Sequence, residues 1–200
     1  MMKNARFFTL IEILVTFAII AILSLIGYGS YSYATNSVKT ARSEALLKNL
    51  QSGLESFYNN HSYYPQSAAD GKLNAVVVTL GTDNTVYKIN FGVTELEDSP
   101  SDPVKKKQFN SFAKAVDLET LKQNRDSSGR LTDAWGVVIY YRAPGAINTT
   151  SFDLIAPGED GGFGSGKVAA PPETPVVTGE SGRTYIDKDN DWICDDIANF

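Results

Sequence analysis

The strongest constraint on this chain is an almost uninterrupted apolar run close to its N-terminus. Residues 7–27, FFTLIEILVTFAIIAILSLIG, contain one ionisable side chain, that of Glu12. About 20 consecutive apolar residues is the length at which an α-helix crosses the hydrocarbon core of a bilayer. The basic residues Lys3 and Arg6 precede the run and favour a cytoplasmic N-terminus. The run therefore predicts a single membrane-spanning helix.

A cleaved secretory signal or a simple anchor would have a similar charge and length. The run is long for the apolar part of a secretory signal, and it lacks a small-x-small cleavage site before the polar sequence begins. Glu12 separates these alternatives, because a carboxylate within a membrane helix costs roughly 2.5–3.5 kcal/mol and normally has a partner and a role. No other group in the run can neutralise it. We therefore expect a partner from elsewhere, with the free amino terminus of a neighbouring copy as the natural candidate.

Composition argues against several other classes of protein. The net charge of −5 makes nucleic acid an unexpected partner. The single cysteine, Cys194, excludes an internal disulfide framework and a cysteine-based zinc cluster, and is expected to be a small buried filler. With His61 as the one histidine, there is no histidine pair for a metal and no obvious Ser–His arrangement. We expect no enzymatic activity.

Helical periodicity continues beyond the apolar run. Apolar residues recur at spacings of three and four with polar residues between them, and this face is expected to pack on the protein's own sheet. Its members are Val38, Ala41, Ala45, Leu47, Leu50, Leu54 and Phe57. The helix should end near residues 59–61, with His61 as a turn residue.

The rest of the chain predicts short strands and little helix. Strands are expected at 74–80, 87–93, 137–142 and 151–156, with a turn at 143–145 and a helix at 111–123. The lysines Lys105–Lys107 follow several acidic residues and are expected to form a solvated turn. Trp135 is expected to anchor the core of the sheet.

Aspartates are concentrated near the C-terminus, where they alternate with other residues. Six to eight oxygens at about 2.4 Å suit calcium, and carboxylates at this density repel one another without a cation. The pattern resembles half of an EF-hand loop, but Trp192 replaces its glycine and Ala198 its glutamate, so a complete EF-hand is excluded. A solvated acidic tail is the alternative. The candidate calcium ligands are Asp160, Asp187, Asp189, Asp191, Asp195 and Asp196.

Several stretches resemble the type IV pilin-like family, and most closely the major pseudopilin of type II secretion systems. Residues 8–12, FTLIE, resemble its N-terminal signal, although Phe7 stands where the family usually has glycine. Residues 62–65, SYYP, resemble its tyrosine-proline turn. Residues 133–162 resemble its "DPWG…Y.Y..PG…YDL.S.G.DG..GG" signature, with Ala134 for proline, and residues 196–200 its "DI.NW" ending. The stretch between Gly166 and Asp187 is an insertion.

This resemblance implies an α+β fold in five segments. They are a leader (1–7), a transmembrane and filament-core helix (8–28), its amphipathic continuation (29–61), a variable region (62–131), and an antiparallel sheet with a C-terminal calcium-binding loop (132–200). It also implies that a prepilin peptidase cleaves between Phe7 and Phe8, and that the new terminus is N-methylated. Glu12 then pairs with a neighbour's terminus during assembly, and one Ca²⁺ ion binds the C-terminal loop.

The function implied by the resemblance is that of a structural subunit of a type II secretion pseudopilus. Copies would polymerise into a helical periplasmic filament that drives protein secretion across the outer membrane, with minor pseudopilins and inner-membrane secretion components as partners. Before assembly the chain would cross the inner membrane once. Its head, the globular part that follows the membrane helix, would lie in the periplasm. The alternatives are a type IV pilus subunit on the cell surface and a membrane-anchored calcium-binding module that does not polymerise. The lack of a second cysteine favours the pseudopilin.

Overall fold

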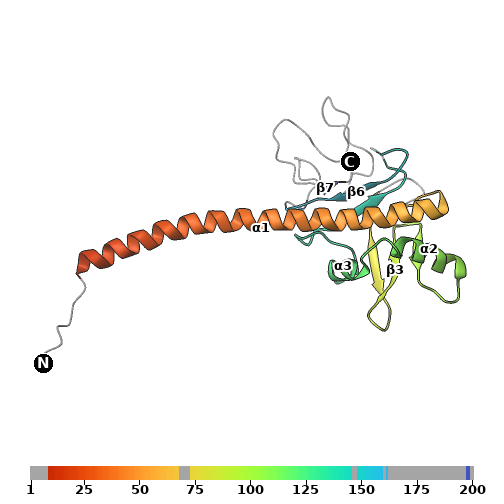
Figure 1. Ribbon diagram of the computed structural model, residues 1–200, viewed down its shortest axis with the longest axis horizontal. Coiled ribbons are helices and arrows are strands. Elements are labelled where there is room, and N and C mark those ends of the chain that lie inside the picture. Colours follow the sequence, from red (N-terminus) through yellow and green to blue (C-terminus); the bar gives the residue numbers. More distant parts are fainter. Residues whose placement is uncertain (1–8, 68–72, 146–147, 160, 162–196, 199–200) are drawn as a thin grey trace. The chain divides into compact units, whose positions relative to one another are not determined.

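The computed structural model describes residues 9–67, 73–145, 148–159, 161 and 197–198. The chain divides into two compact units, residues 1–39 and 40–200. Helix α1 (Leu10–His61) runs from the first unit into the second, and the remaining elements belong to the second (Figure 1). The predicted α+β class is confirmed, because the C-terminal part of α1 packs on small antiparallel sheets.

Helix α1 is long because nothing in its sequence interrupts it. Residues 10–61 contain no proline, the residue that costs a helix interior most. The helix ends where the sequence predicts, at His61. Ser62 follows with a positive φ of 61°, and its N–H donates to the Tyr58 carbonyl over 2.7 Å. This is the left-handed arrangement that closes many helices, and Pro65 follows soon afterwards.

The second unit's part of α1 buries one stripe of side chains. The predicted apolar residues Leu47, Leu50, Leu54 and Phe57 are buried, which confirms that part of the face. The prediction is wrong for Val38, Ala41 and Ala45, which are exposed. The stripe begins instead at Ser43 and Leu46. Because successive helical residues are about 100° apart, Ala41 and Ala45 lie one or two positions before this stripe and turn away from it.

The strands form two antiparallel sheets, one on each side of the C-terminal part of α1 (Figure 1). The first has the order β1-β5-β6-β7 and the second the order β2-β3-β4. Their bounds are β1 (Asn74–Ala75), β2 (Val77–Leu80), β3 (Val86–Asn90), β4 (Glu95–Glu97), β5 (Tyr140–Arg142), β6 (Asp153–Ala156) and β7 (Ile197–Ala198). Register pairs include Tyr141 with Leu154 and Ile89 with Leu96.

The strand predicted at 74–80 is in fact two strands in different sheets. The chain leaves the first sheet after β1 and enters the second at β2, and Val76 between them is fully buried. The N–H of Val76 donates to the Ile139 carbonyl over 3.2 Å. The strands predicted at 87–93, 137–142 and 151–156 correspond to β3, β5 and β6, each shorter than predicted.

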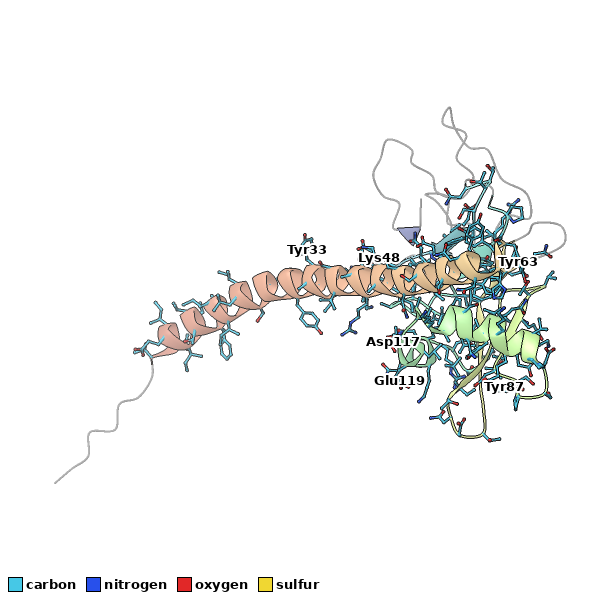
Figure 2. All side chains as sticks on the ribbon, turned by 45° about the vertical axis from the view of Figure 1, so that its right-hand side comes forward. Tyr33, Lys48, Tyr63, Tyr87, Asp117 and Glu119 are labelled. Carbon is cyan, nitrogen blue, oxygen red and sulfur yellow. The ribbon has the colours of Figure 1, made fainter. Side chains whose placement is uncertain are left out.

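The helix predicted at 111–123 is wrong, because the structure has two helices there. They are α2 (Pro103–Ala113) and α3 (Leu118–Gln123). Asp102 caps α2 by accepting from the N–H groups of Val104 and Lys105, and Pro103 occupies the first turn, where its missing N–H costs nothing. Asp117 caps α3 (Figure 2).

Two further predictions fail around these elements. Lys105–Lys107 do not form a turn, since they lie in α2, where Lys105 is 3.1 Å from Glu97 and Lys106 is 3.3 Å from Asp98. Trp135 is not a core anchor, because it lies partly exposed in a turn. The largest fully buried side chains are those of Tyr141, Phe57, Phe91, Phe112 and Phe152. Phe91 contacts both Phe112 and Tyr141, at ring-centroid distances of 5.6 and 4.9 Å.

Candidate assembly site at the start of the long helix

Glu12 lies in the first turn of α1 and is hydrogen-bonded to the residue that precedes the helix. Its Oε2 atom accepts from the Thr9 N–H at 2.7 Å and from the Thr9 hydroxyl at 2.8 Å. In return, the Glu12 N–H donates to the Thr9 hydroxyl oxygen over 3.3 Å. This reciprocal arrangement is a capping box, in which a Thr-x-x-Glu sequence satisfies N–H groups that the first helical turn leaves free.

The capping box supplies two hydrogen bonds to Glu12 that we did not predict. The prediction was that no other group in the apolar run neutralises this carboxylate. The signal was present in the sequence as Thr9-Leu10-Ile11-Glu12, which has the capping-box spacing. Thr9 is a neutral donor, however, so it does not compensate the charge of the carboxylate.

The second carboxylate oxygen leaves room for another donor. Both bonds from Thr9 go to Oε2, and from residue 9 onward no described group donates to Oε1. The residue is exposed, and the helix N-terminus already favours a negative charge at this position. The arrangement therefore suits a carboxylate that is oriented by its own helix and can accept a charged donor from outside it.

The surface of α1 that follows Glu12 is apolar on all sides. The large apolar side chains between residues 10 and 25 are between 48% and 82% exposed. They are Leu10, Ile11, Ile13, Leu14, Val15, Phe17, Ile19, Ile20, Ile22, Leu23 and Leu25. Figure 2 shows side chains radiating from this half of the helix, with the exposed Tyr33 labelled further along it. A helix that is apolar all round normally has its surface covered by other apolar groups.

We predicted a membrane span over residues 8–28. Over the part of the chain that the structure describes, no helix is both long enough and apolar enough to cross a membrane.

The other predicted site residues concern cleavage and calcium binding. Phe7 and Phe8 lie outside the described residues, as do the six candidate calcium ligands Asp160, Asp187, Asp189, Asp191, Asp195 and Asp196. Among the residues that are described, no group of three or more His, Cys, Asp or Glu side chains could hold a metal ion. Calcium binding and the cleavage position therefore remain predictions.

His61 is the last residue of α1 and bonds to α2. Its Nε2 atom lies 3.0 Å from the hydroxyl oxygen of Ser111, and that hydroxyl donates to the Gln108 carbonyl over 2.7 Å. The His61 ring must therefore donate to Ser111, which is the opposite of what a base activating a serine would do. Burial, aided by the nearby positive charge of Lys107, lowers the pKa of His61.

Residues 2–28 match the model of the prokaryotic N-terminal methylation motif. This chain carries a type IV pilin-type N-terminal signal. The matched stretch contains Phe7, Phe8, Glu12 and most of the exposed apolar surface. No curated protein and no solved structure matches the chain.

The methylation motif indicates a type IV pilin-like protein, a subunit of a pilus or pseudopilus located in the cell envelope. It implies processing by a prepilin peptidase and assembly into pilus-like filaments. The matched stretch contains a carboxylate oriented by Thr9 and, after it, an exposed apolar surface.

Proposed function

We propose that this chain is the structural subunit of a type II secretion pseudopilus and polymerises through the first half of α1. The observation that carries the proposal is the state of Glu12 within a methylation motif. One oxygen is bonded to Thr9, the other accepts nothing from the described residues, and an exposed apolar surface follows. A methylated amino terminus of a neighbouring copy is the charged donor that completes this arrangement.

The assembly test compares two glutamates of α1. Glu12→Gln keeps the size of the side chain but removes its charge, and should reduce filament yield at least about tenfold, as expected when an ion pair in an apolar environment is lost. Glu55→Gln is the matched control, because Glu55 is exposed and accepts a hydrogen bond from Gln51 over 2.9 Å. Single cysteines placed between residues 10 and 25 should give crosslinked ladders in wild type and in Glu55→Gln only. Ladders of normal length in Glu12→Gln would contradict the proposal.

Processing is proposed to occur between Phe7 and Phe8. Mass spectrometry of the mature protein should find an N-terminal methylated Phe8. A mature chain that still contains Met1 or Lys3 would exclude this position. Until it is cleaved and assembled, the subunit is proposed to be held in the inner membrane with its head in the periplasm, on the strength of the apolar run 7–27 and the basic residues before it. Alkaline extraction of membranes checks this, since an inserted chain stays in the pellet.

The pseudopilus is preferred to a surface pilus because the single cysteine, Cys194, cannot close an internal disulfide in the head. Deletion of this subunit should stop the export of folded proteins, while the amount of surface fibres should equal that of the wild type. Loss of shearable surface fibres with normal export would assign it to a type IV pilus instead. An anchored module that does not polymerise would give no ladders in any variant.

One Ca²⁺ ion is proposed to bind the acidic C-terminal segment and to stabilise the head. Support comes from the density of aspartates between residues 187 and 196, whose charges repel one another without a cation. Calcium should raise the thermal midpoint of the head, and a chelator should lower it again, by the ordinary linkage of ligand binding to stability. Magnesium at the same concentration is the control. An unchanged midpoint would remove calcium from the proposal.

A further inference from the structure

Two five-residue loops in the second unit share one backbone design. We call residues 126–130 (DSSGR) the first DxxG loop and residues 133–137 (DAWGV) the second DxxG loop. In each, the N–H of the first residue donates to the carbonyl of the fifth over 2.8 Å. The N–H of the fourth residue donates to the carbonyl of the first, over 3.0 and 3.1 Å respectively. The fourth residue is a glycine at a φ of 82° or 85°, a conformation that favours glycine.

The aspartate that opens each loop uses the same oxygen in the same way. Oδ1 of Asp126 accepts from the N–H groups of Ser128 and Arg130, both at 2.9 Å. Oδ1 of Asp133 accepts from the N–H groups of Trp135 and Val137, also at 2.9 Å. One oxygen is therefore enough to hold either loop, and the second oxygen of each aspartate is available for a different contact.

The loops differ in what this second oxygen binds. Oδ2 of Asp126 accepts from Nε of Arg130, 2.7 Å away within its own loop. Oδ2 of Asp133 accepts from the N–H of Gly158 at 3.1 Å, just beyond the end of β6. Asp133 is only 3% exposed, and burial raises its pKa although several backbone N–H groups oppose the shift. A buried carboxylate is costly unless it is hydrogen-bonded, and three backbone N–H groups, including that of Gly158, offset this cost for Asp133.

The second DxxG loop also contacts α1. The N–H of Ala134 donates to the hydroxyl oxygen of Ser43 over 3.0 Å, and Ser43 is fully buried in the helix. The first loop has no such bond among the described contacts. Asp133 therefore binds Gly158, where the segment after β6 begins (the C-terminal segment), and its neighbour Ala134 binds Ser43 of α1.

We propose that the second DxxG loop is a clamp that couples α1 to the start of the C-terminal segment, with Asp133 as its positioning residue. A five-residue loop held by four internal hydrogen bonds moves as a unit, so a displacement of Gly158 is transmitted to Ser43 and the reverse. The clamp requires neither calcium nor a filament. It allows a conformational change near Gly158 to alter the position of α1, the helix that carries the methylation motif.

The test measures amide hydrogen exchange, residue by residue, in the full chain in detergent. Asp133→Asn keeps one oxygen for the loop but turns an NH₂ group toward the N–H of Gly158, so it removes one contact of the clamp. We expect exchange at Gly158 to accelerate about tenfold, equivalent to about 1.4 kcal/mol in the local opening equilibrium. Asp126→Asn is the matched control and should leave Gly158 unchanged. A merely structural role for Asp133 would accelerate exchange throughout the core of α1 as well.

The coupling itself is tested from the other side of the clamp. Ser43→Ala does not touch Gly158, yet it should accelerate exchange there several-fold. Ser52→Ala is its control, because the Ser52 hydroxyl donates to the Lys48 carbonyl on the exposed side of α1. Equal exchange at Gly158 in Ser43→Ala and Ser52→Ala would overturn the proposal. This second comparison decides the matter even if Asp133→Asn does not fold.

Discussion

Between residues 10 and 25 of α1 every large apolar side chain is exposed, whereas between residues 43 and 57 the buried side chains lie on one face. Leu14 is 61% exposed and Leu54 is fully buried, although both are leucines in the interior of the same helix. Helix propensity cannot distinguish them. The difference is one of pattern, since polar residues interrupt the second half at helical spacing and are nearly absent from the first.

The two halves of this helix therefore present different surfaces. The second half gains its stability from the chain's own core, as surface helices of globular proteins do. The first half has apolar surface without a core of its own, which is the condition for association with other apolar groups. Substitutions should therefore affect head stability in the second half and assembly in the first.

The largest expected effect comes from truncating the buried leucine. Leu54→Ala should destabilise the head by about 2–5 kcal/mol, because it removes apolar contacts and leaves a cavity. Leu14→Ala is the matched control and should leave the unfolding midpoint of the head unchanged while weakening crosslinked ladders. Chemical denaturation in detergent measures the first effect. A similar loss of head stability in both variants would break the comparison between the two halves.

A smaller effect is expected at Gly53, where α1 and α2 are in close contact. An added Cβ would lie 2.2 Å from Cγ2 of Val116 and 2.7 Å from the ring of Phe112. Gly53→Ala should therefore destabilise the head by about 1–3 kcal/mol through overpacking. The sign is informative, because alanine is the better helix former by about 1 kcal/mol. A more stable variant would show that the contact can relax.

Ser43 offers a sharper test of what the second half binds. Ser43→Ala should cost about 1 kcal/mol, since the N–H of Ala134 loses its acceptor, the hydroxyl oxygen of the buried Ser43. Ala134→Pro removes that N–H, and it places proline at the second position of a turn, where proline is favoured. In the Ala134→Pro background, Ser43→Ala should therefore cost much less. Additive effects in this double-mutant cycle would contradict the bond.

The smallest effect is expected from pH, at the end of the second half. The folded-state pKa of His61 is below the ordinary value of 6.5, so the unfolded chain binds a proton first as the pH falls. The contribution of His61 to head stability should therefore be fully present above about pH 6.5 and decrease below it. The decrease should be less than about 1 kcal/mol, because the ring is partly exposed. His61→Gln should flatten the stability profile between pH 5 and 7. An equally steep profile in that variant would assign the pH dependence to other groups.

The features that the sequence predicted correctly depend on neighbours along the chain. The course of α1, its end at His61 and the apolar surface after Glu12 follow from hydropathy, periodicity and the absence of proline. The turn at 143–145 and the strands around it follow from alternation and turn residues. The capping box of Thr9 and Glu12 is equally local, and its spacing was open to prediction.

The features that the sequence did not predict depend on contacts between distant residues. Two helices replace the one predicted at 111–123, because Asp117 caps a new helix, α3, and its N–H donates to Oδ1 of Asn49 in α1 over 2.9 Å. Lys105 and Lys106 of α2 pair with Glu97 and Asp98, at the end of β4 and just after it. The segment predicted as one strand at 74–80 pairs with β5 in its first part and with β3 in its second. The local sequence around each residue does not indicate which distant residue it will contact.

The two DxxG loops show where this boundary lies. The sequence by itself determined both loops, because an aspartate and a glycine three residues apart supply the acceptor and the positive φ that such a turn needs. Only the tertiary structure decided which donors the second carboxylate oxygens bind. Oδ2 of Asp126 accepts from Arg130 in its own loop, and Oδ2 of Asp133 accepts from Gly158. The physical reason is that a hydrogen bond within five residues is set by local geometry, whereas one across 25 residues requires distant parts of the chain to pack together.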